Sequence, residues 1–175
     1  MAEDVMRYAD KVGLDRFVLL GHSMGGKAAM TASHLFPERI EAIVSVDSCP
    51  KDNTDDHRYT EGTYEIFNVI TQVDLEGHTR RTILEHLDSK FPNNKGLANF
   101  LAMNIVYEGE KGDRIKWIAN IPALHRHLRS MYEFERLGTF NGPALMLVGE
   151  KSFSFPLEVY RESFPCLREE DVVVV

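Results

Sequence analysis

The sequence predicts an α/β fold: a parallel sheet of about four strands with helices on both faces and a helical insertion between two of the strands. Short apolar runs, typical of buried parallel strands, recur along the chain and alternate with helical patterns. The stretch between the second and third runs has helical periodicity and little strand pattern. Strands that alternate with helices favour right-handed crossovers and hence a parallel sheet.

The first quarter of the chain predicts helix, strand, helix and strand in that order. Apolar residues at helical spacing predict a helix over 2–12, which Gly13 ends. Residues 17–20 form a wholly apolar run, as expected for a strand that is covered on both faces. A helix over 24–35 and a strand over 40–46 follow.

The rest of the chain divides into an insertion and a return to the sheet. We expect a core made of 1–48 and 138–175, and a helical cap insertion over 49–137. The insertion shows helical patterns over 64–73, 79–90, 95–106 and 122–136, with a turn at 109–113. The return to the sheet is predicted as a strand over 143–148, a helix over 156–164 and a strand over 172–175.

The most specific motif is Gly21-His22-Ser23-Met24-Gly25, a G-x-S-x-G sequence between the first strand and the second helix. In this context it predicts a nucleophile elbow, a sharp strained turn that exposes the serine hydroxyl. Glycines at 21 and 25 would let strand and helix pass closely. Ser23 is therefore the candidate nucleophile, and the Met24 N–H at the helix start is the candidate oxyanion donor. A plain strand–helix turn is the alternative.

Composition and charge narrow the function classes. The 175 residues are 43% hydrophobic and 27% charged, with a net charge of −7 and no basic cluster, which argues against nucleic-acid binding. No apolar run is long enough for a membrane span. Cys49 and Cys166 form no C-x-x-C, which favours an intracellular, reducing environment, and no metal-ligand spacing occurs. The N-terminal residues read as a helix, so no targeting segment is predicted.

Four segments together resemble the α/β-hydrolase superfamily, and within it a group of serine esterases with small bacterial members. They are Gly21–Lys27, Val46–Pro50, Trp117–Leu124 and Gly142–Gly149, and the resemblance extends over nearly the whole chain. It implies a carboxylic ester hydrolase, lipase-like, that acts on an acyl ester or thioester without a metal or organic cofactor. The eukaryotic member of that group is mitochondrial, so the resemblance points to that organelle.

The resemblance also implies roles for particular residues. Ser23 is implied as the nucleophile, and Asp47, 24 residues later at the end of the next strand, as the acid that orients a histidine. Both would lie at the carboxyl ends of neighbouring parallel strands. Asp47 could instead serve only as a turn residue before Pro50. Glu150, which follows the strand after the insertion, is the alternative acid.

A histidine base is the element that this sequence does not supply at the expected place. The resemblance implies a histidine in a loop after the last strand, whereas no histidine follows His127. We therefore expect the 175 residues to represent the second half of the sheet plus the cap, incomplete at both ends, and to be inactive alone. The alternative is an inactive binding or scaffold module, with a protein partner on the open edge of the strand over 17–20.

The expected acyl site is apolar. Phe100, Met103 and Trp117 of the insertion, with His22 of the elbow, are the candidate substrate-binding residues. Each of the large apolar residues could instead pack only within the insertion's own core.

Overall fold

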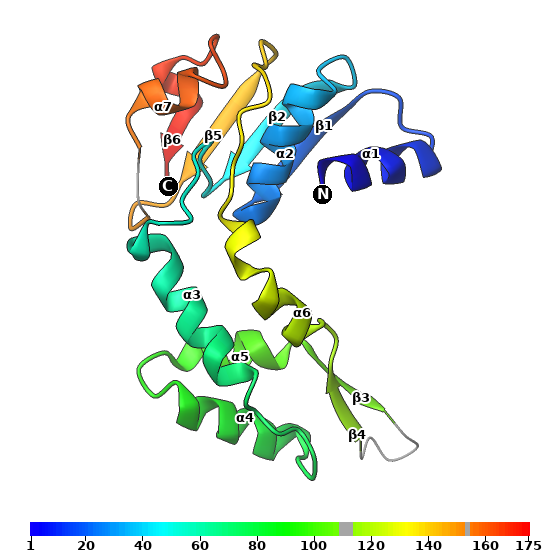
Figure 1. The fold of residues 1–175 in the computed structure, drawn as a ribbon, viewed down its shortest axis with the longest axis vertical. Coiled ribbons are helices and arrows are strands. Elements are labelled where there is room, and N and C mark those ends of the chain that lie inside the picture. Colours follow the sequence, from blue (N-terminus) through cyan, green and yellow to red (C-terminus); the bar gives the residue numbers. More distant parts are fainter. Residues whose placement is uncertain (109–113, 153–154) are drawn as a thin grey trace. The chain divides into compact units, whose positions relative to one another are not determined.

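The computed structural model describes residues 1–108, 114–152 and 155–175 (Figure 1). They divide into two compact units, one of Met1–Asp55 with Met131–Val175 and one of Asp56–Ser130. The second unit is narrower than the predicted insertion over 49–137. The difference arises because segments at both ends of that range are hydrogen-bonded within the first unit, as the contacts of Lys27 show below.

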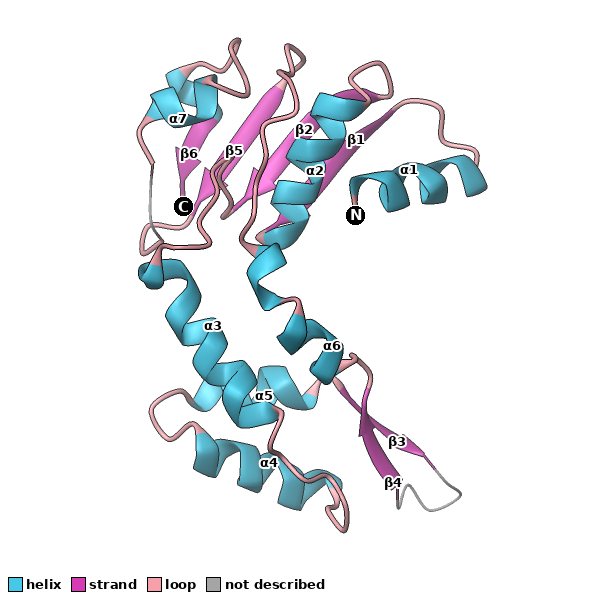
Figure 2. Cartoon of the chain, in the orientation of Figure 1, coloured by secondary structure: helices cyan, strands magenta, loops and turns pink. Residues whose placement is uncertain are grey.

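The first unit is built on four parallel strands in the order β1-β2-β5-β6 (Figure 2). The strands are β1 (Phe17–His22), β2 (Ile40–Val46), β5 (Ala144–Val148) and β6 (Val172–Val174). The predicted parallel sheet is thereby confirmed. His22 pairs with Val46, and Val46 pairs with Leu147. The carboxyl ends of the first three strands in the sheet therefore align at one edge.

The helices of the first unit lie on one side of this sheet, where the second packs directly on the first two strands and the first packs against the second helix. They are α1 (Ala2–Lys11), α2 (Met24–Leu35) and α7 (Leu157–Arg161), and a 3-10 turn, η2 (Glu169–Asp171), leads into β6. Their buried residues join those of the strands in one cluster, whose fully buried members include Met30, Ile43, Met146, Tyr160 and Phe164. Burial of these large side chains stabilises the unit by roughly 1.5–3 kcal/mol each.

The opposite face of β1 is open among the described residues. Val18 and Leu20 are 54% and 70% exposed, whereas their neighbours Phe17 and Leu19 pack against the core cluster. The expectation that this strand would be covered on both faces is therefore met on one face only. β1 is also one of the two outer strands of the described sheet, so its second backbone edge has no neighbouring strand there.

The second unit consists of helices and one hairpin. Its elements are α3 (His57–Ile70), α4 (Arg80–Lys90), α5 (Lys95–Ala102), β3 (Ile105–Glu108), β4 (Arg114–Trp117), α6 (Ile121–Arg126) and the 3-10 turn η1 (Leu128–Met131), whose last residue belongs to the first unit. β3 and β4 are antiparallel. The unit has its own apolar core, in which Ile83, Leu87 and Ala98 are almost fully buried.

Two predicted helices of the insertion are shorter than expected. The helix predicted over 95–106 ends at Ala102, because Ile105-Val106-Tyr107 forms β3 and β-branched and aromatic residues favour a strand. The helix predicted over 122–136 is replaced by α6 and η1, with irregular structure beyond. The turn predicted at 109–113 lies outside the described residues.

Candidate active site

Ser23 lies between β1 and α2 in a strained conformation. Its φ of 52° and ψ of −120° are unusual for a residue with a side chain. Its N–H donates to the Val46 carbonyl at 2.9 Å, which continues the strand ladder by one residue. Serine at a helix N-cap normally accepts a hydrogen bond from the first turn. The Ser23 side chain makes no such bond and is exposed, so its hydroxyl is available for chemistry.

Two glycines allow the close approach behind this turn. A Cβ on Gly21 would lie 2.1 Å from the Gly25 carbonyl oxygen, and a Cβ on Gly26 would lie 2.6 Å from the Ser48 Cβ. A Cβ on Gly25 would meet nothing within 4 Å. The sequence predicted that Gly21 and Gly25 provide the clearance. The structure requires it at Gly21 and Gly26, because Gly25 contributes its backbone, not its missing side chain, to the crowded contact.

The first turn of α2 presents backbone donors beside the serine. The amides of Gly26 and Lys27 both donate to the Ser23 carbonyl, at 2.9 and 3.2 Å. The amides of Met24 and Gly25 precede the first intrahelical bonds, as helix geometry requires. These two N–H groups, together with the positive end of the helix dipole, can bind an oxyanion. The role of Met24 as oxyanion donor stays a prediction.

Asp47 follows β2 as Ser23 follows β1. It has a φ of 51°, and its N–H donates to the Leu147 carbonyl at 2.7 Å. Both carboxylate oxygens accept hydrogen bonds from the turn after β5: Oδ1 from the Gly149 N–H at 3.2 Å and Oδ2 from the Ser152 hydroxyl at 2.8 Å. These two donors fix the orientation of the exposed carboxylate.

Sequence reasoning missed the partners of Asp47. Ser152 lies three residues after Gly149, the glycine that follows β5, and its N–H donates to the Gly149 carbonyl to close the turn. The spacing of Gly149 and Ser152 after a predicted strand indicates such a turn, and it was the signal in the sequence that could have pointed to Ser152. The Glu150 amide donates to the Val175 carbonyl in the same turn, and its exposed side chain makes no described contact with Asp47. Its role as the alternative acid stays a prediction.

The two histidines of the first unit, His22 and His34, make no described hydrogen bond to Ser23 or Asp47. His22 is the exposed last residue of β1. His34 is buried near the end of α2, with its ring 6.0 Å from that of Phe134 and 5.7 Å from that of Phe164. Burial lowers the pKa of His34, so the neutral ring is favoured. The remaining histidines, His57, His78, His86, His125 and His127, belong to the second unit.

The predicted acyl-site residues of the insertion have three different environments. Phe100 is 58% exposed on α5. Met103, just after that helix, is 69% exposed and helps to line a cavity of about 380 Å³ with Leu84 and Tyr107. Trp117 is half-buried against the core of the second unit. Only Met103 of the three lines this cavity, and a substrate-binding role for each stays a prediction.

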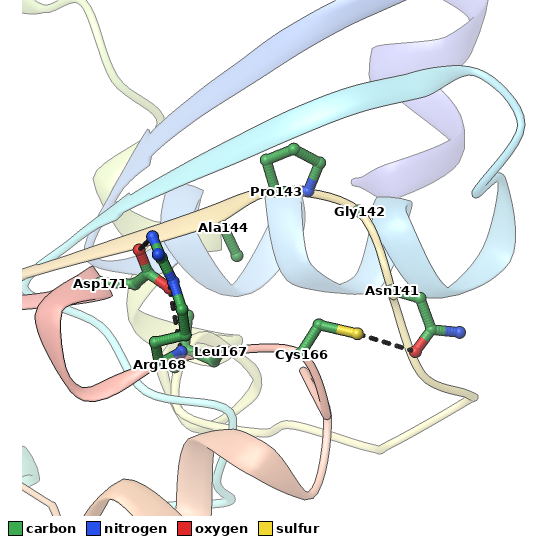
Figure 3. Close-up of a pocket in the computed structure, with 8 residues that line it drawn as sticks. All are labelled: Asn141, Gly142, Pro143, Ala144, Cys166, Leu167, Arg168 and Asp171. Atoms are coloured by element: carbon green, nitrogen blue, oxygen red, sulfur yellow. Dashed lines mark hydrogen bonds and ion pairs between the residues drawn. The ribbon is translucent and has the colours of Figure 1, made fainter.

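A second cavity, of about 240 Å³, lies at the opposite edge of the sheet from Ser23 and Asp47. Its lining comes from the segments that lead into β5 and β6, where Arg168 and Asp171 form a bidentate ion pair at 2.8 and 3.0 Å (Figure 3). Cys166 donates a long 3.9 Å bond to the Asn141 side chain there. This cavity is separate from the candidate site, because it adjoins the amino ends of the strands.

Two further observations concern cofactors and membranes. Within residues 1–108, 114–152 and 155–175, no group of three or more histidine, cysteine, aspartate or glutamate side chains is placed to hold a metal ion. None of the helices in that part of the chain combines the length and apolar character that crossing a bilayer requires.

Comparisons with known proteins give consistent results. The family model described as alpha/beta hydrolase fold matches residues 1–174. The chain is 33% identical over 178 residues to the sn-1-specific diacylglycerol lipase ABHD11 of Xenopus tropicalis. This alignment covers 97% of the chain and 54% of that protein. It is 28% identical over 165 residues to Esterase YbfF of Escherichia coli, with 93% and 59% covered.

Among solved structures, a marine microorganism esterase aligns with a TM-score of 0.86 and 25% identity, over 99% of this chain and 67% of that one. The chain spans about half the length of the curated relatives it matches.

Proposed function

The chain belongs to the alpha/beta hydrolase fold family, and from that premise we propose that it carries the nucleophile and the acid of a serine hydrolase of acyl esters. The relatives named as lipase and esterase support an ester as the substrate class. The observation that carries the proposal is the strained Ser23 turn, whose hydroxyl is exposed and not used as a helix cap. Such strain is retained mainly where function needs it.

In the proposed reaction the Ser23 oxygen forms a bond to the acyl carbon and the ester alcohol departs. A histidine takes the serine proton and passes it to the leaving alcohol, and water then releases the acid by the reverse proton path. The amides of Met24 and Gly25 would stabilise the negative oxygen of each tetrahedral intermediate. Asp47 would orient the histidine and stabilise its charged form. Glu150 is the alternative acid.

The proposal assigns the base to a histidine outside residues 1–175. Ser23 and Asp47 have no histidine partner among their described hydrogen bonds, and the chain spans about half of its relatives. The 175 residues alone are then expected to be inactive toward esters. Since the Xenopus relative is named as a diacylglycerol lipase, a glycerolipid ester is the first substrate to test, with a thioester as the second.

Predicted substrate contacts come from His22 beside the nucleophile and from Phe100, Met103 and Trp117 of the second unit. Met103 lines a cavity of the second unit whose volume of about 380 Å³ is large enough for part of an acyl chain. A mitochondrial location stays part of the proposal on the family resemblance alone.

A second candidate function is a binding or scaffold module that does no chemistry. The exposure of Val18 and Leu20 on an outer strand of the described sheet favours it, because an apolar edge strand is a site for pairing with another protein. The two candidates differ in whether Ser23 reacts.

Ester hydrolysis tests the proposal. We would assay monoacyl and diacyl glycerol esters with the longest form of the protein that its source contains, with the 175 residues, and with Ser23→Ala and Asp47→Asn variants. The proposal expects Ser23→Ala to lower kcat/KM by about a thousandfold or more. Hydrolysis that survives in Ser23→Ala would refute it. A protein that is folded but inactive in every form would favour the binding module.

A further inference from the structure

Lys27 is a buried cation on the helix that begins at the candidate nucleophile. It is 8% exposed, and its ammonium donates to the carbonyls of Lys51 and Tyr132, each at 2.6 Å. Burial lowers the pKa of Lys27, as expected where little water reaches the charge. A methionine could fill the same volume without any acceptors, so packing alone does not explain a lysine here.

The two acceptors belong to the segments by which the chain leaves and re-enters the first unit. We name residues 49–55 and 131–134 the crossing segments. The Asn53 backbone N–H donates to the same Tyr132 carbonyl at 3.0 Å, and the Asn53 side-chain Nδ2 donates to the Cys49 sulfur at 3.3 Å. The Tyr132 carbonyl therefore joins the crossing segments to each other, and Lys27 joins both of them to α2.

Lys27 is also directly connected to the candidate nucleophile through the backbone. Its N–H donates to the Ser23 carbonyl at 3.2 Å, so the ammonium and the serine belong to the same first turn of α2. The Phe134 ring, in the second crossing segment, lies 6.0 Å from the ammonium. The Lys27 side chain thus connects the helix turn that follows Ser23 to both crossing segments.

We propose that Lys27 is a positioning residue for substrate binding: its ammonium holds the crossing segments on the nucleophile helix and so fixes where the helical unit is anchored. The proposal deepens the proposed ester hydrolase function and rests on it for its substrate. It assigns Lys27 no part in bond making or breaking.

Three variants test this proposal. Lys27→Met keeps an unbranched stem but removes the donors. Lys27→Arg keeps a cation that can donate to two carbonyls. Lys11→Met is the matched control, because Lys11 is an exposed lysine of α1.

The first measurement is backbone hydrogen exchange, which needs no enzymatic activity. We expect Lys27→Met to speed exchange in the crossing segments by about tenfold or more, with strands β2 and β5 unchanged. Lys11→Met should exchange as the unaltered protein does. Unchanged crossing segments, or an equal increase throughout the sheet, would overturn the proposal.

The second measurement is steady-state kinetics with a long-acyl and an acetyl ester. For Lys27→Met we expect KM for the long-acyl ester to rise about tenfold while kcat for the acetyl ester changes less than about twofold. Lys27→Arg should recover at least half of the loss. An equal fall of kcat on both esters would overturn the positioning role. If the unaltered protein hydrolyses no ester, the proposed function fails, and hydrogen exchange still decides whether Lys27 anchors the crossing segments.

Discussion

Ser23 and Asp47 occupy equivalent positions on neighbouring strands: each directly follows one member of the register pair His22 and Val46. Both have a left-handed φ, 52° and 51°, and both donate their N–H to the next strand in the sheet. Non-glycine residues in this conformation cost about 1–3 kcal/mol each. Two of them in register at the carboxyl edge of a parallel sheet indicate a site at that edge, where ligands bind in such folds.

The bond from Ser152 to Asp47 predicts a catalytic effect of a residue that does not touch the proposed reacting atoms. Ser152→Ala removes one of the two donors that orient the carboxylate. We expect kcat for ester hydrolysis to fall about tenfold, since a hydrogen bond to a charged group is worth about 1.5–3 kcal/mol. KM should change little. Lys151→Ala, an exposed change in the same turn, is the control, and equal effects of the two variants would argue against this role.

The unequal space around Gly21 and Gly25 predicts a large loss of stability for one alanine substitution and little change for the other. Gly21→Ala places a Cβ 2.1 Å from a backbone oxygen, which a flexible side chain cannot relieve. We expect it to lower the free energy of unfolding by about 3 kcal/mol or more. Gly25→Ala meets open space, and we expect a change within about 1 kcal/mol. Urea unfolding of both variants measures this, and comparable losses would contradict the geometry.

His34 predicts that the fold loses stability in acid. Burial lowers its pKa in the folded state, so the unfolded chain, with an ordinary histidine pKa near 6.5, binds the proton more readily. The contribution of neutral His34 to the free energy of unfolding is therefore complete above about pH 6.5. It is lost as the pH falls toward the lower pKa of His34 in the folded state. The slope from this single group is at most about 1.4 kcal/mol per pH unit.

Unfolding midpoints between pH 7.5 and 5.5 measure the effect. The matched variant is His34→Phe, because Phe134 and Phe164 already surround the ring. We expect a smaller loss of stability on acidification in this variant, whatever its absolute stability. An identical slope in both proteins would show that His34 is not the group responsible.

The sheet and the strand–turn–helix sequence around Ser23 were predictable because their determinants are local. Apolar runs gave the strands at 40–46 and 143–148 to within a residue, and the glycine pattern identified the turn at Ser23. The hairpin of β3 and β4 was missed, since Ile105-Val106-Tyr107 continues a helical pattern from α5. Pairing with the residues up to Trp117 decides between the two outcomes, and that contact is not visible in a local window.

The contacts of the candidate site were only partly predictable for the same reason. The placement of Asp47 opposite Ser23 follows from parallel strands of matching register. Its bonds to Gly149 and Ser152 connect residues more than a hundred positions apart, and so do those between Lys27 and Tyr132. The need for glycine at position 26 was not predicted, because it depends on the contact that a Cβ there would make with Ser48 after β2.

The most direct test of the central claim is covalent labelling by a fluorophosphonate, followed by peptide mass mapping, in the 175 residues and in the longest native form. We predict one label, on the peptide that contains Ser23, in the longer form, and its loss in Ser23→Ala. We also predict little or no label in the 175 residues, because the proposed function assigns the activating histidine to a position outside them. A label on any other residue, or none in an otherwise folded longer form, would contradict the assignment of Ser23 as the nucleophile.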